Sequence, residues 1–151
     1  VADTYQGTEL WDLSLVDPDN RRPVDYDLRA SMLRGLSGIP AVDATGAAKL
    51  HLVARLLRLR REDPEAFLAA SSYEPLDAGE RAVAFVRAGR VVTVAPTRAL
   101  QVERAGWGDD AVRLPDGEWL DVLTGHEHRG GEHPLGALLR DFPVAVLRRR
   151  G

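Results

Sequence analysis

The chain has 151 residues, of which 44% are hydrophobic and 28% are charged, as in an ordinary globular protein with one sizeable core. The formal net charge of −3 argues against nucleic-acid binding, which requires a basic surface. The sequence shows no apolar run near the ~20 residues of a membrane span and no signal-peptide pattern, and its lack of cysteine excludes disulfides and fits a cytoplasmic protein.

The first 25 residues combine a weak strand with an unusual loop. Residues 1–8 begin mildly apolar and predict a strand, whereas residues 5–25 mix carboxylates, two adjacent arginines, two amides, a Tyr and a Trp. So many charges do not enter a core unpaired, and Gly7, Pro18 and Pro23 interrupt any helical period. Such a loop suits a ligand rich in hydroxyl groups, because charged side chains bond its edges and rings stack on its apolar faces.

Two motifs in this loop resemble a known enzyme family. Residues 5–9 (Tyr-Gln-Gly-Thr-Glu) and 17–25 (Asp-Pro-Asp-Asn-Arg-Arg-Pro-Val-Asp) are similar to the end of the last barrel strand and its loop in the α-amylase family of glycoside hydrolases. The resemblance is specific over residues 5–25 and general over the rest of the chain. It implies that residues 1–8 are the eighth strand of a (β/α)8 barrel, whose active-site loops follow the strand ends.

The same resemblance implies that the chain carries no catalytic residue. In that family the nucleophile, the acid/base and the third carboxylate lie on earlier barrel strands, and no counterpart of those motifs occurs here. The chain also begins without Met, directly on the strand-like segment. We therefore expect the C-terminal piece of an enzyme, inactive by itself, whose partner is the missing N-terminal part of the barrel.

Helices are predicted next along the chain. Apolar residues at helical spacing predict a short helix over residues 28–36. A stronger helix over residues 49–61 has a broad leucine-rich stripe, which indicates packing between two layers, and His51 is expected at the edge of that stripe. Asp63 followed by Pro64 predicts an N-cap and a further helix that runs to about residue 70.

From residue 72 onward the hydrophobic period changes from 3.6 to 2. The predicted strands cover residues 81–87 and 90–95, joined by a tight turn, and residues 111–114 and 118–123, joined by a turn at Asp116-Gly117. A short strand between residues 125 and 130, a helical turn over residues 135–140 and a closing strand over residues 144–148 follow. The fold class is therefore α+β: the last strand and helices of a barrel in residues 1–71, then a small antiparallel sheet or sandwich in residues 72–151.

The opening loop supplies the candidate site. Arg21 and Arg22 are expected to bond hydroxyls or to hold the neighbouring acids in place, with a surface salt-bridge network as the alternative. Glu9 and Asp12 are assigned to sugar binding or loop support rather than to catalysis, and Trp11 is either a stacking platform or a packing residue. The predicted substrate-binding set is Tyr5, Gln6, Glu9, Trp11, Asp17, Asp19, Asn20, Arg21, Arg22 and Asp25.

Other candidates favour structural roles. The histidines at positions 126, 128 and 133 lie near two glutamates, but the neighbouring glycines predict a solvated hairpin tip, and we expect no metal site. Trp107 and Trp119 in the β region are expected to pack in the core rather than to form a carbohydrate platform. The sequence contains no phosphate loop and no nucleophile elbow. It also contains no cofactor motif, and we predict no cofactor.

Within the family, the opening motifs are most similar to enzymes that convert the reducing-end α-1,4 bond of a maltooligosaccharide to an α,α-1,1 bond. That reaction implies a retaining route in which the released glucose, held in place, attacks the glycosyl-enzyme instead of water. Two alternatives remain open at this stage. One is another hydrolase or transglucosylase of the same family, and the other is a non-catalytic glucan-binding or interaction module built on the β region.

Overall fold

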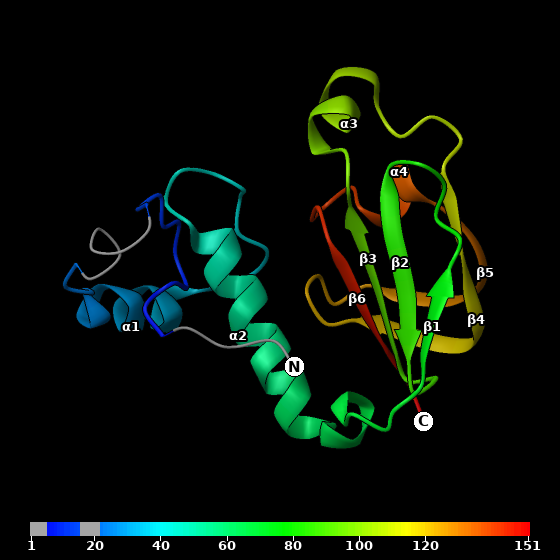
Figure 1. The fold of residues 1–151 in the computed structure, drawn as a ribbon, viewed down its shortest axis with the longest axis horizontal. Coiled ribbons are helices and arrows are strands. Elements are labelled where there is room, and N and C mark those ends of the chain that lie inside the picture. The colour runs from blue at the N-terminus through cyan, green and yellow to red at the C-terminus, as the bar shows by residue number, and fades with distance from the viewer. Residues whose placement is uncertain (1–5, 16–21) are drawn as a thin grey trace. The chain divides into compact units, whose positions relative to one another are not determined.

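The structure is a computed structural model that describes residues 6–15 and 22–151. It confirms the α+β class and the antiparallel sheet. The chain divides into two compact units, residues 1–58 and 59–151, and each is described by itself. The elements, in chain order (Figure 1), are α1 (Tyr26–Gly35), α2 (Ala47–Glu62), the 3-10 helix η2 (Pro64–Phe67), β1 (Tyr73–Leu76), β2 (Ala82–Arg87), β3 (Val91–Pro96), α3 (Ala99–Ala105), β4 (Ala111–Asp121), β5 (Glu127–Pro134), α4 (Leu135–Leu138) and β6 (Ala145–Arg149).

Both predicted helices of the first unit form. Asp25 is the N-cap of α1, and its carboxylate accepts a hydrogen bond from the N–H of Leu28 at 2.8 Å, which satisfies one of the free donors at the helix start. Within α2 the residues Leu50 and Leu59 are buried. His51 is buried as well, so its placement at the edge of the stripe was wrong.

Only the end of the predicted opening strand falls within the described residues. Gln6 and Gly7 lie in a turn, and no strand occurs between residues 6 and 58 in the parts of that range that the structure describes. The assignment of residues 1–71 to the end of a barrel, with a boundary near Ser71, therefore stays a prediction. Ser71 lies just before β1.

The helix predicted after Asp63 is shorter than expected. It is a single 3-10 turn, η2, and the Asp63 side chain makes no cap hydrogen bond. Instead this carboxylate pairs with Arg90 at 3.0 Å. The Arg87 guanidinium donates to the carbonyls of Ala66 and Leu68 at 3.1 and 3.2 Å, so these carbonyls bond the sheet rather than a continuing helix.

The second unit is built on one six-stranded sheet in the order β1-β2-β3-β6-β4-β5, in which every pair is antiparallel. The predicted β2–β3 hairpin is confirmed. Its turn residues Ala88 and Gly89 both have positive φ, as the type I′ turns of hairpins require. The strand β1 and the helix α3 were not predicted, because neither shows a clear hydrophobic period.

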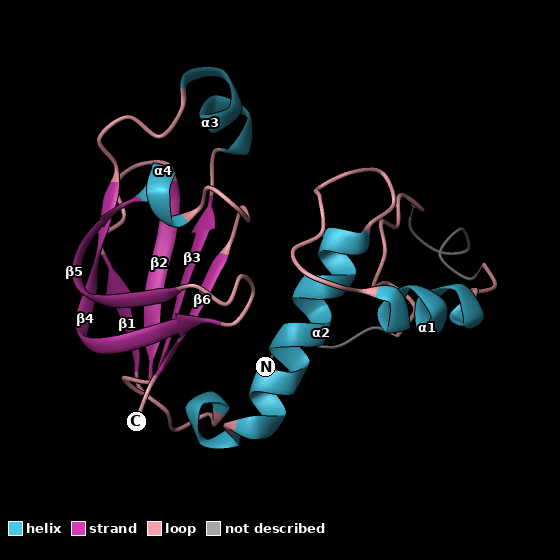
Figure 2. Ribbon diagram, turned by 180° about the vertical axis from the view of Figure 1, so that it is seen from behind, coloured by secondary structure: helices cyan, strands magenta, loops and turns pink. Residues whose placement is uncertain are grey.

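The predicted Asp-Gly turn does not exist, because residues 111–121 form one continuous strand. Figure 2 shows β4 and β5 as long, strongly curved neighbours. Their register shifts between Leu114 and Glu118, so the Pro-Asp-Gly segment is a bulge, which bends a strand and increases its twist. Opposite the bulge, a Cβ on Gly130 would lie 2.6 Å from Asp116 Cα, so only glycine allows this close approach.

The core of the second unit lies on one face of the curled sheet. Alternate residues of the strands point into it, as period-2 patterning requires, and α4 adds Leu135 and Leu138. Trp119 is fully buried, and its indole N–H donates to the Pro115 carbonyl at 2.8 Å. Trp107 packs against the same cluster, so the prediction that both tryptophans pack with the core is confirmed.

The histidine-rich segment is mostly strand, not a hairpin tip, because β5 runs through Gly130 and Gly131 to Pro134. The predicted helical turn after it and the closing strand are confirmed as α4 and β6. Across the described ranges, 6–15 and 22–151, no helix combines the length and the hydropathy that a membrane crossing requires.

Candidate functional site

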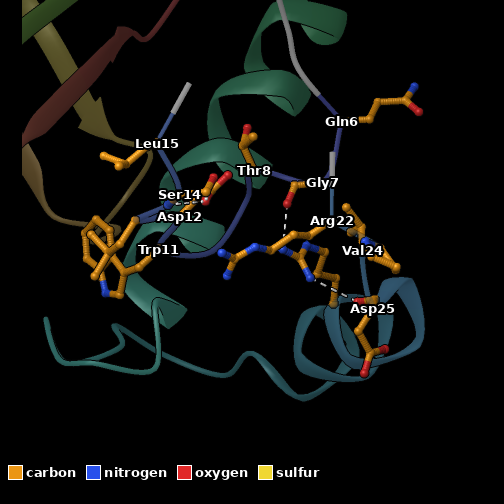
Figure 3. A pocket seen from close by; sticks show the side chains of 13 residues that line it. Gln6, Gly7, Thr8, Trp11, Asp12, Ser14, Leu15, Arg22, Val24 and Asp25 are labelled. Atoms are coloured by element: carbon orange, nitrogen blue, oxygen red, sulfur yellow. Dashed lines mark hydrogen bonds between the residues drawn. The ribbon is translucent and has the colours of Figure 1, made fainter. Parts of the chain in front are cut away.

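A hollow of about 710 Å³ lies between the described parts of the opening loop and the start of α1 (Figure 3). Four residues of the predicted site line it: Gln6, Trp11, Arg22 and Asp25. Glu9 does not line it. The predicted site residues Tyr5, Asp17, Asp19, Asn20 and Arg21 lie outside the described residues.

Arg29 connects the two sides of this hollow. Its guanidinium donates to Glu9 Oε2 at 3.2 Å, to the Gly7 carbonyl at 2.5 Å and to the Asp25 carbonyl at 3.1 Å. Glu9 in turn accepts a hydrogen bond from the Gly7 N–H through Oε1 at 3.0 Å. Both Glu9 oxygens therefore have partners within the protein, which gives Glu9 a supporting role behind the residues that line the hollow.

The charge of Glu9 fits that role. Burial raises the pKa of its carboxyl, but hydrogen bonds from the backbone N–H groups of Gly7 and Glu9, with the charge of Arg29, outweigh it. The pKa therefore lies below its ordinary value. A carboxylate that stays ionised is a permanent acceptor for the guanidinium rather than a proton donor.

Gly7 allows the start of the loop to approach the residues just before α1 closely. Its φ is +93°, and a Cβ at this position would lie 2.7 Å from Cγ2 of Val24. Both the left-handed backbone and the contact exclude a larger residue without movement. The turn at Gly7 is thus open only to glycine, and it is held by hydrogen bonds of Gly7 with Arg29 and Glu9.

Trp11 is half exposed, at 47% of its surface, and lines the hollow. Its indole N–H donates to the Asp43 carbonyl at 2.7 Å, which fixes the orientation of the ring. The Lys49 ammonium lies 5.9 Å from the ring centroid and donates to the Leu10 carbonyl at 2.9 Å. A ring that is held at one edge and open on its surface has the properties of a stacking platform.

Two other acids among the described residues of the loop, Asp12 and Asp25, also bond the protein. Asp12 accepts hydrogen bonds from the hydroxyl and the N–H of Ser14, at 2.5 and 3.0 Å, and these bonds hold the pKa of its carboxyl below the ordinary value. Asp25 uses one oxygen to cap α1. Gln6 points away from the other labelled side chains in Figure 3.

The chemistry available in the hollow is recognition of hydroxyl groups. Asp12, Asp25, Arg22 and Arg29 line it with both signs of charge, so acceptors and donors are both present for the edges of a sugar. Asp12 is ionised at neutral pH and has no proton to give to a leaving group, which a general acid requires. Asp12 therefore fits the role of a hydrogen-bond acceptor and not that of a general acid.

Arg29 and Lys49 were not predicted. Arg29 follows the helix cap Asp25 by four residues, a spacing at which side chains on a helix are neighbours, and this spacing was the only signal in the sequence. The contacts of Lys49 with Leu10 and Trp11 connect residues far apart in the chain, and nothing local indicates them.

The two histidines of β5 contact each other, and one of them contacts the backbone of the same strand. The rings of His128 and His133 lie edge to face with centroids 5.5 Å apart, and His133 Nε2 lies 2.8 Å from the Arg129 carbonyl. Within residues 6–15 and 22–151 the structure contains no group of three or more side chains placed to hold a metal ion.

Comparison with known proteins gives a consistent result. No family model matches the chain. The chain is 44% identical over 99% of its length to a Mycobacterium tuberculosis protein (strain H37Rv) provisionally named maltooligosyl trehalose synthase, and this match covers 19% of that protein. The chain therefore spans about a fifth of the curated relatives that it matches.

Solved structures of the same enzyme share the fold. Maltooligosyltrehalose synthase from Arthrobacter ramosus matches 98% of this chain with a TM-score of 0.86 and 41% identity, over 20% of its own chain. A further crystal structure of a maltooligosyl trehalose synthase matches 97% of this chain with a TM-score of 0.72 and 29% identity, over 19% of its own chain.

Proposed function

We propose that this chain is the C-terminal portion of a maltooligosyl trehalose synthase. Along its whole length it is similar to a segment that makes up about a fifth of such an enzyme. The parent enzyme would convert the reducing-end α-1,4 bond of a maltooligosaccharide to an α,α-1,1 bond. The observation that carries this proposal is the 44% identity over 99% of the chain, which leaves no large segment of the chain unmatched.

In this proposal residues 1–71, which include the whole first unit, are the end of a (β/α)8 barrel. Its apolar side chains support the idea, because among the described residues of this unit only Leu10, Ala48 and Leu50 are buried hydrophobic residues, and α1 buries none. A monomeric surface rarely exposes so much apolar area without a partner to cover it. The large hydrophobic residues exposed in this unit are Trp11, Leu13, Leu15, Tyr26, Leu28, Leu33, Ile39, Val42 and Leu57. The remaining four fifths of the enzyme would cover those that do not line the hollow, which are all of them except Trp11, Leu13 and Leu15.

The residues that line the hollow then form one wall of the sugar site. Trp11 would stack on the apolar face of a glucose unit, and the guanidiniums of Arg22 and Arg29 would donate to its hydroxyls. The catalytic carboxylates would come from the missing part of the barrel. This chain would contribute orientation of the sugar and exclusion of water.

Water exclusion matters because isomerisation and hydrolysis share a glycosyl-enzyme. If glucose stays in place, its anomeric hydroxyl attacks and the α,α-1,1 bond forms. If water enters and attacks instead, glucose is released and the maltooligosaccharide becomes one glucose unit shorter. A wall that holds glucose and keeps water out therefore decides the product.

The test compares the full-length enzyme with this chain alone, each incubated with maltopentaose. The full-length enzyme should form a non-reducing trehalosyl product, and the isolated chain should form none. An increase in reducing ends with the full-length enzyme, without trehalosyl product, would identify a hydrolase instead. Trehalosyl product from the isolated chain would refute the assignment of the catalytic groups to the missing part.

A further inference from the structure

We propose that Arg29 is a positioning residue of the sugar site, which holds the Gly7–Glu9 segment of the wall against α1 and thereby limits entry of water. The inference rests on the proposed function, because it assigns a task within the same site. Arg29 lines the hollow but lies outside the motifs at residues 5–9 and 17–25 that indicated a sugar site.

The three acceptors of Arg29 come from two separate segments. Glu9 and Gly7 belong to the opening loop, and Asp25 precedes α1. One planar guanidinium therefore joins a loop to a helix start that lies about twenty residues later in the chain. The Arg29 side chain is only 18% exposed, so water competes for these hydrogen bonds less than on an open surface.

The geometry requires arginine in particular. Separate nitrogens meet the three acceptors: Nε bonds Glu9, one terminal nitrogen bonds the Asp25 carbonyl and the other bonds the Gly7 carbonyl. A lysine ammonium is a single point with a different reach, and it does not reproduce a planar fork of donors. A lysine at this position should therefore restore charge but only part of the function.

The contacts also explain how Arg29 acts through other residues. It orients the Glu9 carboxylate, whose other oxygen accepts the Gly7 N–H, and it bonds the Gly7 carbonyl directly. Both peptide groups of Gly7 are thus fixed by one side chain and its ion-pair partner. Without Arg29, the hydrogen bond to the Gly7 carbonyl is lost, and the Glu9 carboxylate that accepts the Gly7 N–H loses its ion-pair partner.

The experiment uses the full-length enzyme with Arg29→Met, Arg29→Lys and, as a control, Arg34→Met. Arg34 lies in the last turn of the same helix and does not line the hollow. The measured quantity is the ratio of free glucose to trehalosyl product from maltopentaose. A second measurement is hydrogen exchange at the Gly7 amide, which reports the wall directly.

A purely structural loss would lower both products in proportion, whereas a loosened wall would change their ratio. We expect Arg29→Met to raise the ratio by about tenfold, since displacements near 1 Å cost rates up to ~10²-fold. Arg29→Lys should fall between Arg29→Met and wild type, and Arg34→Met should match wild type. The Gly7 amide should exchange fastest in Arg29→Met, at an intermediate rate in Arg29→Lys and at the wild-type rate in Arg34→Met.

Two results would overturn the inference, and they are distinguishable. If wild type forms trehalosyl product and Arg29→Met leaves both the ratio and the Gly7 exchange unchanged, Arg29 has no positioning role and the proposed function survives. If wild type forms no trehalosyl product, the proposed function fails and the inference fails with it.

Discussion

The tight approach of the loop to α1 yields a prediction that can be worked from distances. In Gly7→Ala, the new Cβ would lie 2.7 Å from Val24 Cγ2, whereas ordinary contact begins near 3.4 Å, so the two segments must separate by about 0.7 Å. Alanine at φ +93° adds backbone strain of about 1–2 kcal/mol. Both effects should move the residues around Gly7 away from the start of α1.

The assay is kcat/KM of the full-length enzyme on maltopentaose. Displacement of this size should lower kcat/KM about tenfold to a hundredfold, which corresponds to about 1.4–2.7 kcal/mol of transition-state stabilisation. Val24→Ala removes the methyl groups that clash, so the Gly7→Ala/Val24→Ala double variant should recover part of the loss. Gly35→Ala is the control, because a Cβ there meets nothing within 4 Å.

Two outcomes would refute this reasoning. Gly7→Ala with unchanged kcat/KM would mean that the wall is not held against α1. A double variant as impaired as Gly7→Ala would mean that the contact with Val24 does not limit the approach, and that backbone strain alone accounts for the loss.

Three further predictions concern stacking, acid stability and the sheet. Trp11→Ala should raise KM for maltopentaose by about threefold to tenfold while Trp11→Phe, which keeps a ring, raises it less, and equal effects would exclude stacking. Because the folded-state pKa of Glu9 lies below its ordinary value of 4.5, its stabilisation is fully present above about pH 4.5 and is lost as the pH falls through the folded-state pKa. The gap in urea midpoint between wild type and Glu9→Gln should therefore close on acidification, and a gap independent of pH would contradict the ionised pair. Gly130→Ala should lower the melting temperature of the β unit by at least about 5 °C, because its Cβ would meet the backbone of Asp116. Gly136→Ala, whose Cβ would make an ordinary 3.5 Å contact with Trp107, should not lower it.

Patterns within a short window predicted much of the fold. The alternation of residues 81–95 and the glycine between the two strands identified the β2–β3 hairpin, since both signals are local. The Asp-Gly pair at residues 116–117 carries the same local signal, but pairing with β5 makes it a bulge. What decides between the two is Gly130, opposite in the sheet and distant in the sequence.

The site shows the same division between local and distant information. The composition of the loop indicated Trp11 and Arg22, which line the hollow. It did not show that Glu9 faces Arg29 and supports the wall from behind, because that contact depends on how the chain returns after residue 22. Single residues with partners far away in the sequence carry no pattern of their own.

The most direct test of the account is a crystal structure of the full-length enzyme with a bound maltooligosaccharide. We expect a glucose unit in the hollow, stacked on Trp11, with sugar hydroxyls within hydrogen-bonding distance of Arg22 or Arg29. Catalytic carboxylates should reach the same sugar from the missing part of the barrel. A sugar bound elsewhere, with Trp11 and Arg29 on an outer surface remote from it, would contradict the central claim.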